Sequence, residues 1–112
     1  MEHKKIDIDA LVGYTISSFK EGEILTKEGK TFYVILSDDG DGGNDSYAFF
    51  KKFDLSQIID RKVVKAWEES NPDEDGAFLK IETPNGTAII EIIHESNGYY
   101  GWSYEIVIKN TN

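Results

Sequence analysis

The stretch from His94 to Trp102 carries the densest mixture of polar and aromatic side chains in the chain. A histidine can act as a general base, and tyrosine and tryptophan rings can stack on a flat ligand. Covalent catalysis needs a nucleophile, a base and a group that orients the base, so His94 would need a second histidine or another suitably positioned side chain. His3 lies in the charged N-terminal stretch and is a poor candidate for this role. We therefore predict no catalytic residues and no enzyme. The prediction that remains is a ligand-binding patch formed by His94, Glu95, Asn97, Tyr99, Tyr100 and Trp102.

His94 also fits a simpler interpretation, because it continues the apolar alternation of the residues before it. Ala88, Ile90 and Ile92 occupy every second position ahead of it, which is typical of one buried face of a strand. The segment Ser96-Asn97-Gly98 is ordinary hairpin-turn chemistry. The sequence leaves open whether His94 is a core or rim histidine or a member of a ligand site.

An acid-rich loop at positions 38–45 is the second candidate site, and it contains glycine and asparagine but no apolar residue. Carboxylates in such a loop can hold Ca²⁺, but the EF-hand pattern requires Gly at its sixth position and Glu at its twelfth. Counted from Asp39, these positions hold Asn44 and Phe50. We therefore predict no metal and no other cofactor.

A second acid-rich segment covers positions 68–75 and holds five acidic residues without a basic one. A surface of one sign attracts a partner of opposite charge and makes association fast and salt-sensitive. It can also imitate a phosphate backbone, whereas the simpler interpretation of both segments is a solvated loop. The predicted partner-binding site consists of the acidic residues of both segments: Glu68, Glu69, Asp73, Glu74, Asp75, Asp38, Asp39, Asp41 and Asp45.

The elements that must position these residues are mostly strands, because apolar residues alternate with polar ones between Gly, Asn and Pro turns. The run at 31–37 is apolar on both faces, which predicts a central strand or one covered on both sides. Asp7 and Asp9 before Ala10, and Asp54 with Gln57 three residues on, predict two short capped helical turns. Strands are expected at 14–19, 23–27, 31–37, 46–53, 62–68, 77–83, 87–95 and 99–109.

Two parts of the chain match each other, each with a short helical turn followed by strands. Residues 10–16 align with 57–63, and residues 26–36 align with 83–93, which sets Thr31 against Ala88. The fold prediction is mainly β (α+β), in a single domain 1–112 with half-repeats at about 7–53 and 54–112. Each half is a helical turn plus a three-stranded antiparallel meander, packed as one sandwich or partly open barrel. Chance similarity between two β-meanders is the alternative.

Composition indicates which class of partner the chain can bind and in which cellular compartment it is expected. The 112 residues contain 12 basic and 21 acidic side chains and have a net charge of −9, so we predict no direct nucleic-acid binding through phosphates. The absence of cysteine excludes disulfides and thiolate metal sites. No apolar stretch is long enough to span a membrane, and no signal-peptide pattern follows Met1, so the expected location is the cytoplasm.

Three segments resemble a small uncharacterised domain family of phages and prophages: 11–16, 26–30 and above all Glu95-Ser96-Asn97-Gly98-Tyr99-Tyr100. The resemblance covers roughly residues 9–108. Members of that family often carry cysteines in the loop that matches positions 38–45, and this chain has none. The resemblance implies a small accessory protein acting in a host cell, and it carries over no activity, cofactor or catalytic residue.

Charge and resemblance together predict a non-catalytic, phage-type inhibitor of a host protein, in counter-defence or in an immunity-like role. Its acidic surface would block a basic or nucleic-acid-binding site of that protein. The alternative is a binding or sequestering protein for a nucleotide-type signal, which would use the aromatic patch near residues 94–102. The two-sided apolar strand at 31–37 leaves a homodimer open.

Overall fold

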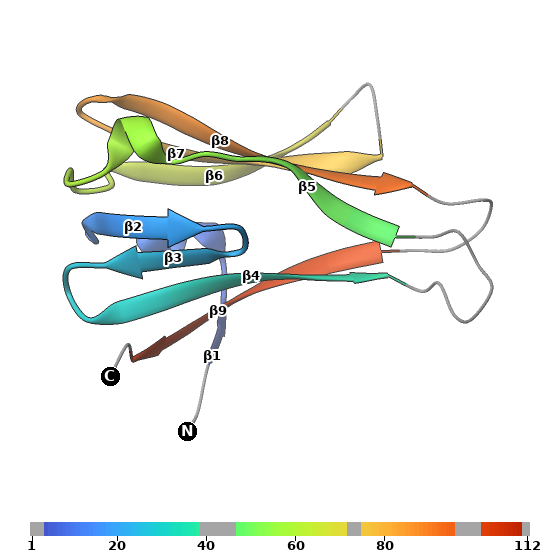
Figure 1. The fold of residues 1–112 in the computed structure, drawn as a ribbon, viewed down its shortest axis with the longest axis horizontal. Coiled ribbons are helices and arrows are strands. Elements are labelled where there is room, and N and C mark those ends of the chain that lie inside the picture. The colour runs from blue at the N-terminus through green and yellow to red at the C-terminus, as the bar shows by residue number, and fades with distance from the viewer. Residues whose placement is uncertain (1–3, 39–46, 72–74, 96–101, 111–112) are drawn as a thin grey trace.

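The chain folds into two antiparallel sheets packed face to face (Figure 1). The structure is a computed structural model, and it describes residues 4–38, 47–71, 75–95 and 102–110. One sheet has the strand order β1-β9-β4-β3-β2 and the other has the order β5-β8-β7-β6. The prediction of a mainly β sandwich is confirmed, and the sheets do not close into a barrel. The strands are β1 (Lys4–Ile6), β2 (Ile16–Lys20), β3 (Glu23–Thr26), β4 (Lys30–Asp38), β5 (Tyr47–Phe53), β6 (Lys65–Ser70), β7 (Gly76–Thr83), β8 (Gly86–Glu95) and β9 (Trp102–Asn110).

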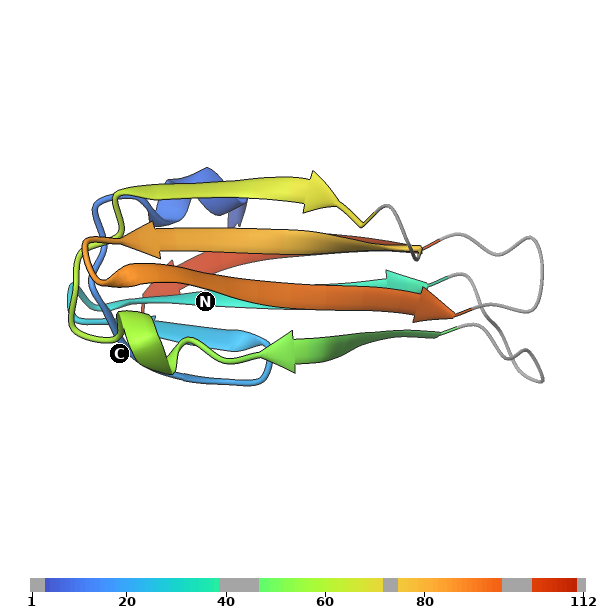
Figure 2. The same ribbon diagram turned by 90° about the horizontal axis from the view of Figure 1, so that it is seen from above.

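Each sheet combines one three-stranded meander with a strand from the other part of the chain. The meanders β2-β3-β4 and β6-β7-β8 are antiparallel. Strand β5 follows β4 in sequence but pairs with β8, and β9 follows β8 but pairs with β4. The exchanged strand β5 lies beside β8 at the edge of its sheet (Figure 2). The sequence analysis expected a three-stranded meander in each half and did not expect the exchange of strands.

The turns of the second hairpin in each meander differ in length by one residue. The backbone N–H of Lys30 donates to Thr26 Oγ1 across three intervening residues. In the other meander, Thr83 pairs directly with Gly86 across only two residues. The strand that leaves the first turn is therefore displaced by one position relative to the strand that leaves the second.

This displacement corrects the alignment of the two meanders. The alignment that sets Thr31 against Ala88 is wrong by one residue in the strand, because a shift of one residue turns every side chain to the opposite face. Thr31 and Phe32 are both buried, so it is the length of the two turns, not burial, that sets Phe32 at the position of Ala88.

The core lies between the two sheets and is built by alternate residues of each strand. Strand β7 alternates strictly between buried and half-buried positions. Phe32 is fully buried at the centre, and the ring of Tyr14 packs edge-on against it with 5.2 Å between ring centroids. Strand β4 is central in its sheet, as predicted, but its outer face is not covered, because Ile35 is 40% exposed.

Both helical elements are single 3₁₀ turns, η1 (Ile8–Leu11) and η2 (Ser56–Ile58). Neither has the predicted side-chain cap: Asp7 makes no capping hydrogen bond, and Asp54 accepts from the backbone N–H and the hydroxyl of Ser56. The amide of Gln57 donates to the carbonyl of Thr87 instead of closing a capping box. Among the described residues, no helix is long and apolar enough to cross a membrane.

Candidate functional site

The two long sides of the sandwich are closed differently. On one side, phenylalanine rings fill the space between the edge strands β2 and β5. The ring centroids of Phe19 and Phe53 are 6.2 Å apart, and Phe50 meets Phe53 edge-on at 5.1 Å.

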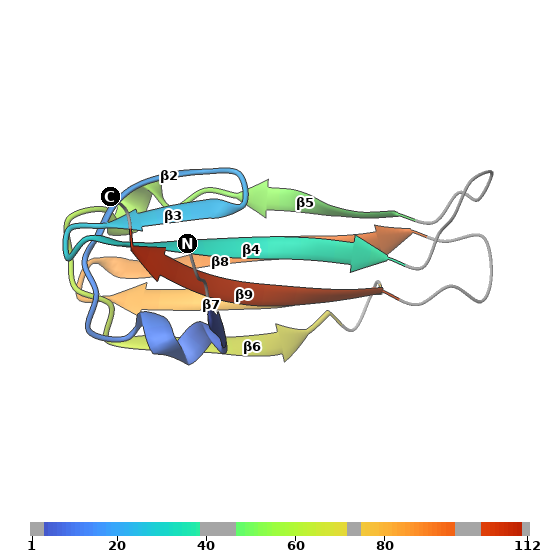
Figure 3. The ribbon, with the colours of Figure 1, turned by 90° about the horizontal axis from the view of Figure 1, so that it is seen from below.

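The opposite side is open between β6 and the strand pair β9–β1. Strand β6 is the outer strand of its meander, as β2 is, but Ala66 stands opposite Ile81 where Phe19 stands opposite Ile24. Strand β9 carries Tyr104 at this side. The smaller alanine and the polar tyrosine leave a groove of about 730 Å³, which is lined in part by Ile8 and Asp9 of η1. Figure 3 shows η1 beside β6.

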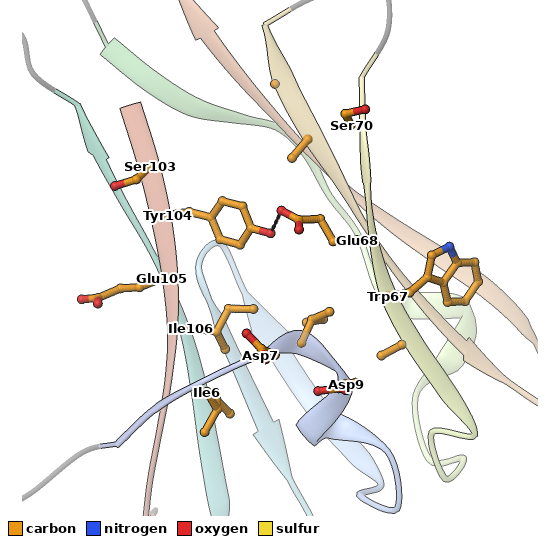
Figure 4. Close-up of a pocket in the computed structure, with 14 residues that line it drawn as sticks. Ile6, Asp7, Asp9, Trp67, Glu68, Ser70, Ser103, Tyr104, Glu105 and Ile106 are labelled. Atoms are coloured by element: carbon orange, nitrogen blue, oxygen red, sulfur yellow. Dashed lines mark hydrogen bonds between the residues drawn. The ribbon is translucent and has the colours of Figure 1, made fainter. Parts of the chain in front are cut away.

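The groove combines an apolar floor with an acidic rim. Ile6, Ile8 and Ile106 supply apolar surface, and Asp7 and Glu68 lie at the rim, with Asp9 beside them. The described residues that line the groove include no lysine, arginine or histidine. The side chain of Glu105 also belongs to the lining strand but points away from the interior (Figure 4). The groove is therefore suited to a cationic group that carries apolar surface.

Tyr104 and Glu68 meet across the groove, where the tyrosine hydroxyl donates a hydrogen bond to Glu68 Oε2 (Figure 4). Burial raises the pKa of Tyr104 well above its usual range, and the hydrogen bond to Glu68 and the negative charges of Glu68 and Asp7 raise it further. The phenol is thus a neutral donor that links the two sheets at the open side.

We expect the raised pKa of Tyr104 to weaken the fold in alkali. Above about pH 10 the unfolded tyrosine loses its proton while the folded one keeps it, so the free energy of unfolding falls as the pH rises. Tyr104→Phe should remove this part of the decline. Urea unfolding of both proteins between pH 8 and pH 12 measures it, and parallel declines would contradict the assignment.

Glu68 and Glu69 lie on opposite faces of β6, because neighbouring residues of a strand alternate. Glu68 faces the groove, whereas Glu69 accepts hydrogen bonds from Trp67 Nε1 at 2.7 Å and from Lys80 Nζ at 2.9 Å on the outer face. These donors lower the pKa of Glu69. The two neighbouring glutamates predicted as parts of one partner site thus face different surroundings.

His94 is a buried histidine, as one of the two interpretations of the sequence expected. Its side chain is 0% exposed, and its Nδ1 lies 2.8 Å from Oδ2 of Asp75. The backbone N–H of His94 also donates to the carbonyl of Asp75 at 2.7 Å. Asp75 therefore fixes the end of β8, while the neighbouring Glu95 is exposed.

The remaining predicted site residues meet at one end of the sandwich or lie outside the described residues. The backbone of Asp38 pairs with that of Trp102, so the first residue of the acid-rich loop lies beside the last residue of the aromatic patch. The structure does not describe Asp39, Asp41, Asp45, Asp73, Glu74, Asn97, Tyr99 and Tyr100.

The sequence prediction included one groove residue, Glu68, and missed Asp7, Asp9 and Tyr104. The two aspartates were interpreted as helix caps, and Tyr104 was only one position of the strand expected at 99–109. A usable signal was present in the aligned halves, because one edge strand has Phe19 where the other has Ala66. A large residue replaced by a small one at matching core positions indicates an unfilled space.

Comparison of the chain with protein-family models, with curated proteins and with solved structures finds no match. The resemblance to a phage domain family therefore stays a prediction. Within the described ranges, no group of three or more histidine, aspartate or glutamate side chains could hold a metal ion. The groove is the candidate site that the geometry of the described residues favours.

Proposed function

We propose that this chain is a non-catalytic inhibitor that binds a basic surface of another protein through the groove between β6 and β9. The observation that carries the proposal is the composition of the groove: Asp7, Asp9 and Glu68 at the rim, and no basic residue among the described lining. The proposed target is a basic or nucleic-acid-handling host protein, as the resemblance to phage accessory proteins implies. Its location would be the host cytoplasm.

Charge and apolar surface have separate roles in this binding. The net charge of −9 would steer a basic partner toward the protein, and this attraction weakens as salt shortens the screening length. The apolar floor at Ile8 and Ile106 would then be buried by the partner, which is favourable at about 25 cal/mol per Å². The same charge repels nucleic acid, so the partner is expected to be a protein.

Reversal of the rim charges is expected to abolish binding. The test variant is Asp7→Lys, Asp9→Lys and Glu68→Lys in one chain, used with the wild type to capture partners from bacterial lysate treated with nuclease. We expect a basic protein on the wild type at low salt, its release at high salt, and a loss of at least 100-fold with the variant. A 100-fold loss corresponds to about 2.8 kcal/mol, because each factor of ten is worth about 1.4 kcal/mol.

The matched control is Glu21→Lys, Glu23→Lys and Glu82→Lys, which lie outside the groove. Both variants carry a net charge of −3, since three reversals each add two positive charges to −9. Equal losses in the two variants would show that only net charge matters and would contradict a groove site. An empty capture at low salt would contradict the proposal itself.

We also propose that the two halves arose by duplication. The two meanders with exchanged fourth strands support it, as does the antiparallel bridge between Thr15 and Lys62, which occupy aligned positions. Gly13 and Asp60 are also aligned, and both have positive φ, 96° and 69°. Related sequences whose halves align with a one-residue gap in the first turn would test this origin.

A further inference from the structure

We infer that β6 is a docking edge: an extended segment of the partner with lysine or arginine at alternate positions adds to β6 as a new strand and places its cationic side chains in the groove. This inference rests on the proposed function and specifies the partner's shape. Addition of a strand to an open sheet edge is a common mode of peptide recognition, in which backbone hydrogen bonds give affinity and side-chain pockets give specificity.

The backbone of β6 offers hydrogen-bonding groups on its outer side. β6 is the last strand of its sheet, and among the described strands it pairs with β7 alone. Asn71 N–H donates to the carbonyl of Gly76 at 3.3 Å, in the register that pairs Ser70 with Ala77. Because N–H groups alternate sides along an antiparallel strand, Glu68 and Ser70 direct their N–H and C=O groups away from β7.

The far end of this edge is not covered by the rest of the described chain. The 3₁₀ turn η1 packs against β6, over the part of the strand near its start in Figure 3. The strand continues past η1 to Glu68 and Ser70, which are both exposed. No described residue makes a backbone hydrogen bond to the outward N–H and C=O groups of Glu68 and Ser70, so both positions can receive an incoming strand.

The side-chain positions beside this edge match alternate cationic residues. Ala66, Glu68 and Ser70 line the groove, while the ring of Trp67 points to the other face (Figure 4). A strand beside β6 would direct every second side chain into the groove. A lysine or arginine there would lay its aliphatic stem on the apolar floor and bring its charge to Asp7 and Glu68.

The charges of the edge also argue against a second copy of this chain as the occupant. Two β6 strands paired edge to edge would bring together Glu68 and Glu69 from both copies. Like charges on neighbouring strands are destabilising, and charged edges are a common protection against self-association. A basic strand is attracted to this edge instead, because its positive charges are complementary to the glutamates of β6.

The test uses a synthetic eight-residue peptide of alternating lysine and valine, capped at both ends, titrated into the full-length ¹⁵N-labelled protein at low salt. We expect chemical-shift changes at β6 and η1, together with slower amide exchange at Glu68 and Ser70. The same peptide with N-methyl groups on every second backbone amide, those that would face β6, cannot donate hydrogen bonds to β6 and should bind at least 10-fold more weakly. The matching glutamate–valine peptide should not bind.

A protein variant tests the same edge without a change of charge. Ser70→Pro removes an outward N–H, and proline is tolerated on edge strands where the N–H faces solvent. We expect at least a 10-fold loss of peptide affinity with little change in thermal stability, whereas Ser70→Ala should bind as the wild type does.

Two outcomes separate this inference from the proposed function. If the N-methylated peptide and Ser70→Pro bind as tightly as their parents, strand addition is wrong, while the acidic groove can still bind a folded basic surface. If the lysine peptide does not bind but charge reversal in the groove abolishes capture of a basic protein, the inference also fails and the function stands. If both experiments fail, the function fails as well.

Discussion

Phe32→Ala is expected to lower the free energy of unfolding by about 4 kcal/mol. Phe32 is 0% exposed and lies in the central strand β4, where its ring packs against Tyr14. The substitution removes buried apolar surface and leaves a cavity that two rigid sheets cannot close. Loss of this packing should also loosen the contact between the sheets on which the groove depends.

Urea unfolding followed by circular dichroism measures this effect, with Ile35→Ala as the matched control. Ile35 lies in the same strand but on the outer face and is 40% exposed, so its truncation should cost less than about 1 kcal/mol. If the two substitutions had similar effects, the assignment of inner and outer faces in β4 would be wrong.

Gly76→Ala is the second large expected effect, with a loss of about 3 kcal/mol. A Cβ at this position would lie 2.1 Å from the backbone carbonyl oxygen of Ile92, so the two strands would have to separate. Gly76 also follows Asp75, whose carbonyl accepts from the His94 backbone at 2.7 Å. A shift of the strand would therefore disturb the buried His94 as well.

The control for this prediction is Gly29→Ala, measured by the same unfolding experiment. Nothing lies within 4 Å of a Cβ at Gly29, but its φ of 86° is unfavourable for alanine. The cost there should be about 1–2 kcal/mol, from backbone conformation alone. Equal stability of Gly76→Ala and the wild type would contradict the close approach of β7 to β8.

Most strands were predictable because their periodicity is local. The run at 31–37 predicted β4 as a central strand, and the alternation at 77–83 and 87–95 on either side of a turn predicted β7 and β8. Alternation from Ala88 to Ile92 also gave a buried face as one of two interpretations of His94, and His94 is buried. Each of these inferences needs only neighbouring residues and the two-residue period of a strand.

The exchange of β5 and β9 between sheets was not predictable in the same way. Alternation in 46–53 indicates a strand with an apolar face, but it does not specify which sheet completes that face. Strand β1 was missed because its three residues are too short to show a period, and its pairing with β9 is made across the length of the chain. The one-residue register difference depends on the conformation of a turn.

The candidate site was predictable only in part, because the groove is formed by residues distant in sequence. Glu68 stood out as a member of an acid-rich segment. Asp7 lies near Glu68 only because η1 packs against β6. Tyr104 lies near Glu68 because β9 pairs within the first sheet. The volume of the groove depends on the small side chain of Ala66. The sequence alone does not show which residues surround Ala66, so it does not show that its small size leaves a space.

The measurement that tests the central claim most directly is hydrogen–deuterium exchange of the protein bound to the captured basic partner. The account predicts slower exchange concentrated at 7–11 and at Glu68–Ser70, with the outer face of the sheet around Tyr33 and Ile35 unchanged. Slower exchange confined to that outer face, or to the end of the sandwich near Trp102, with no change at β6 and η1, would contradict the groove as the binding site.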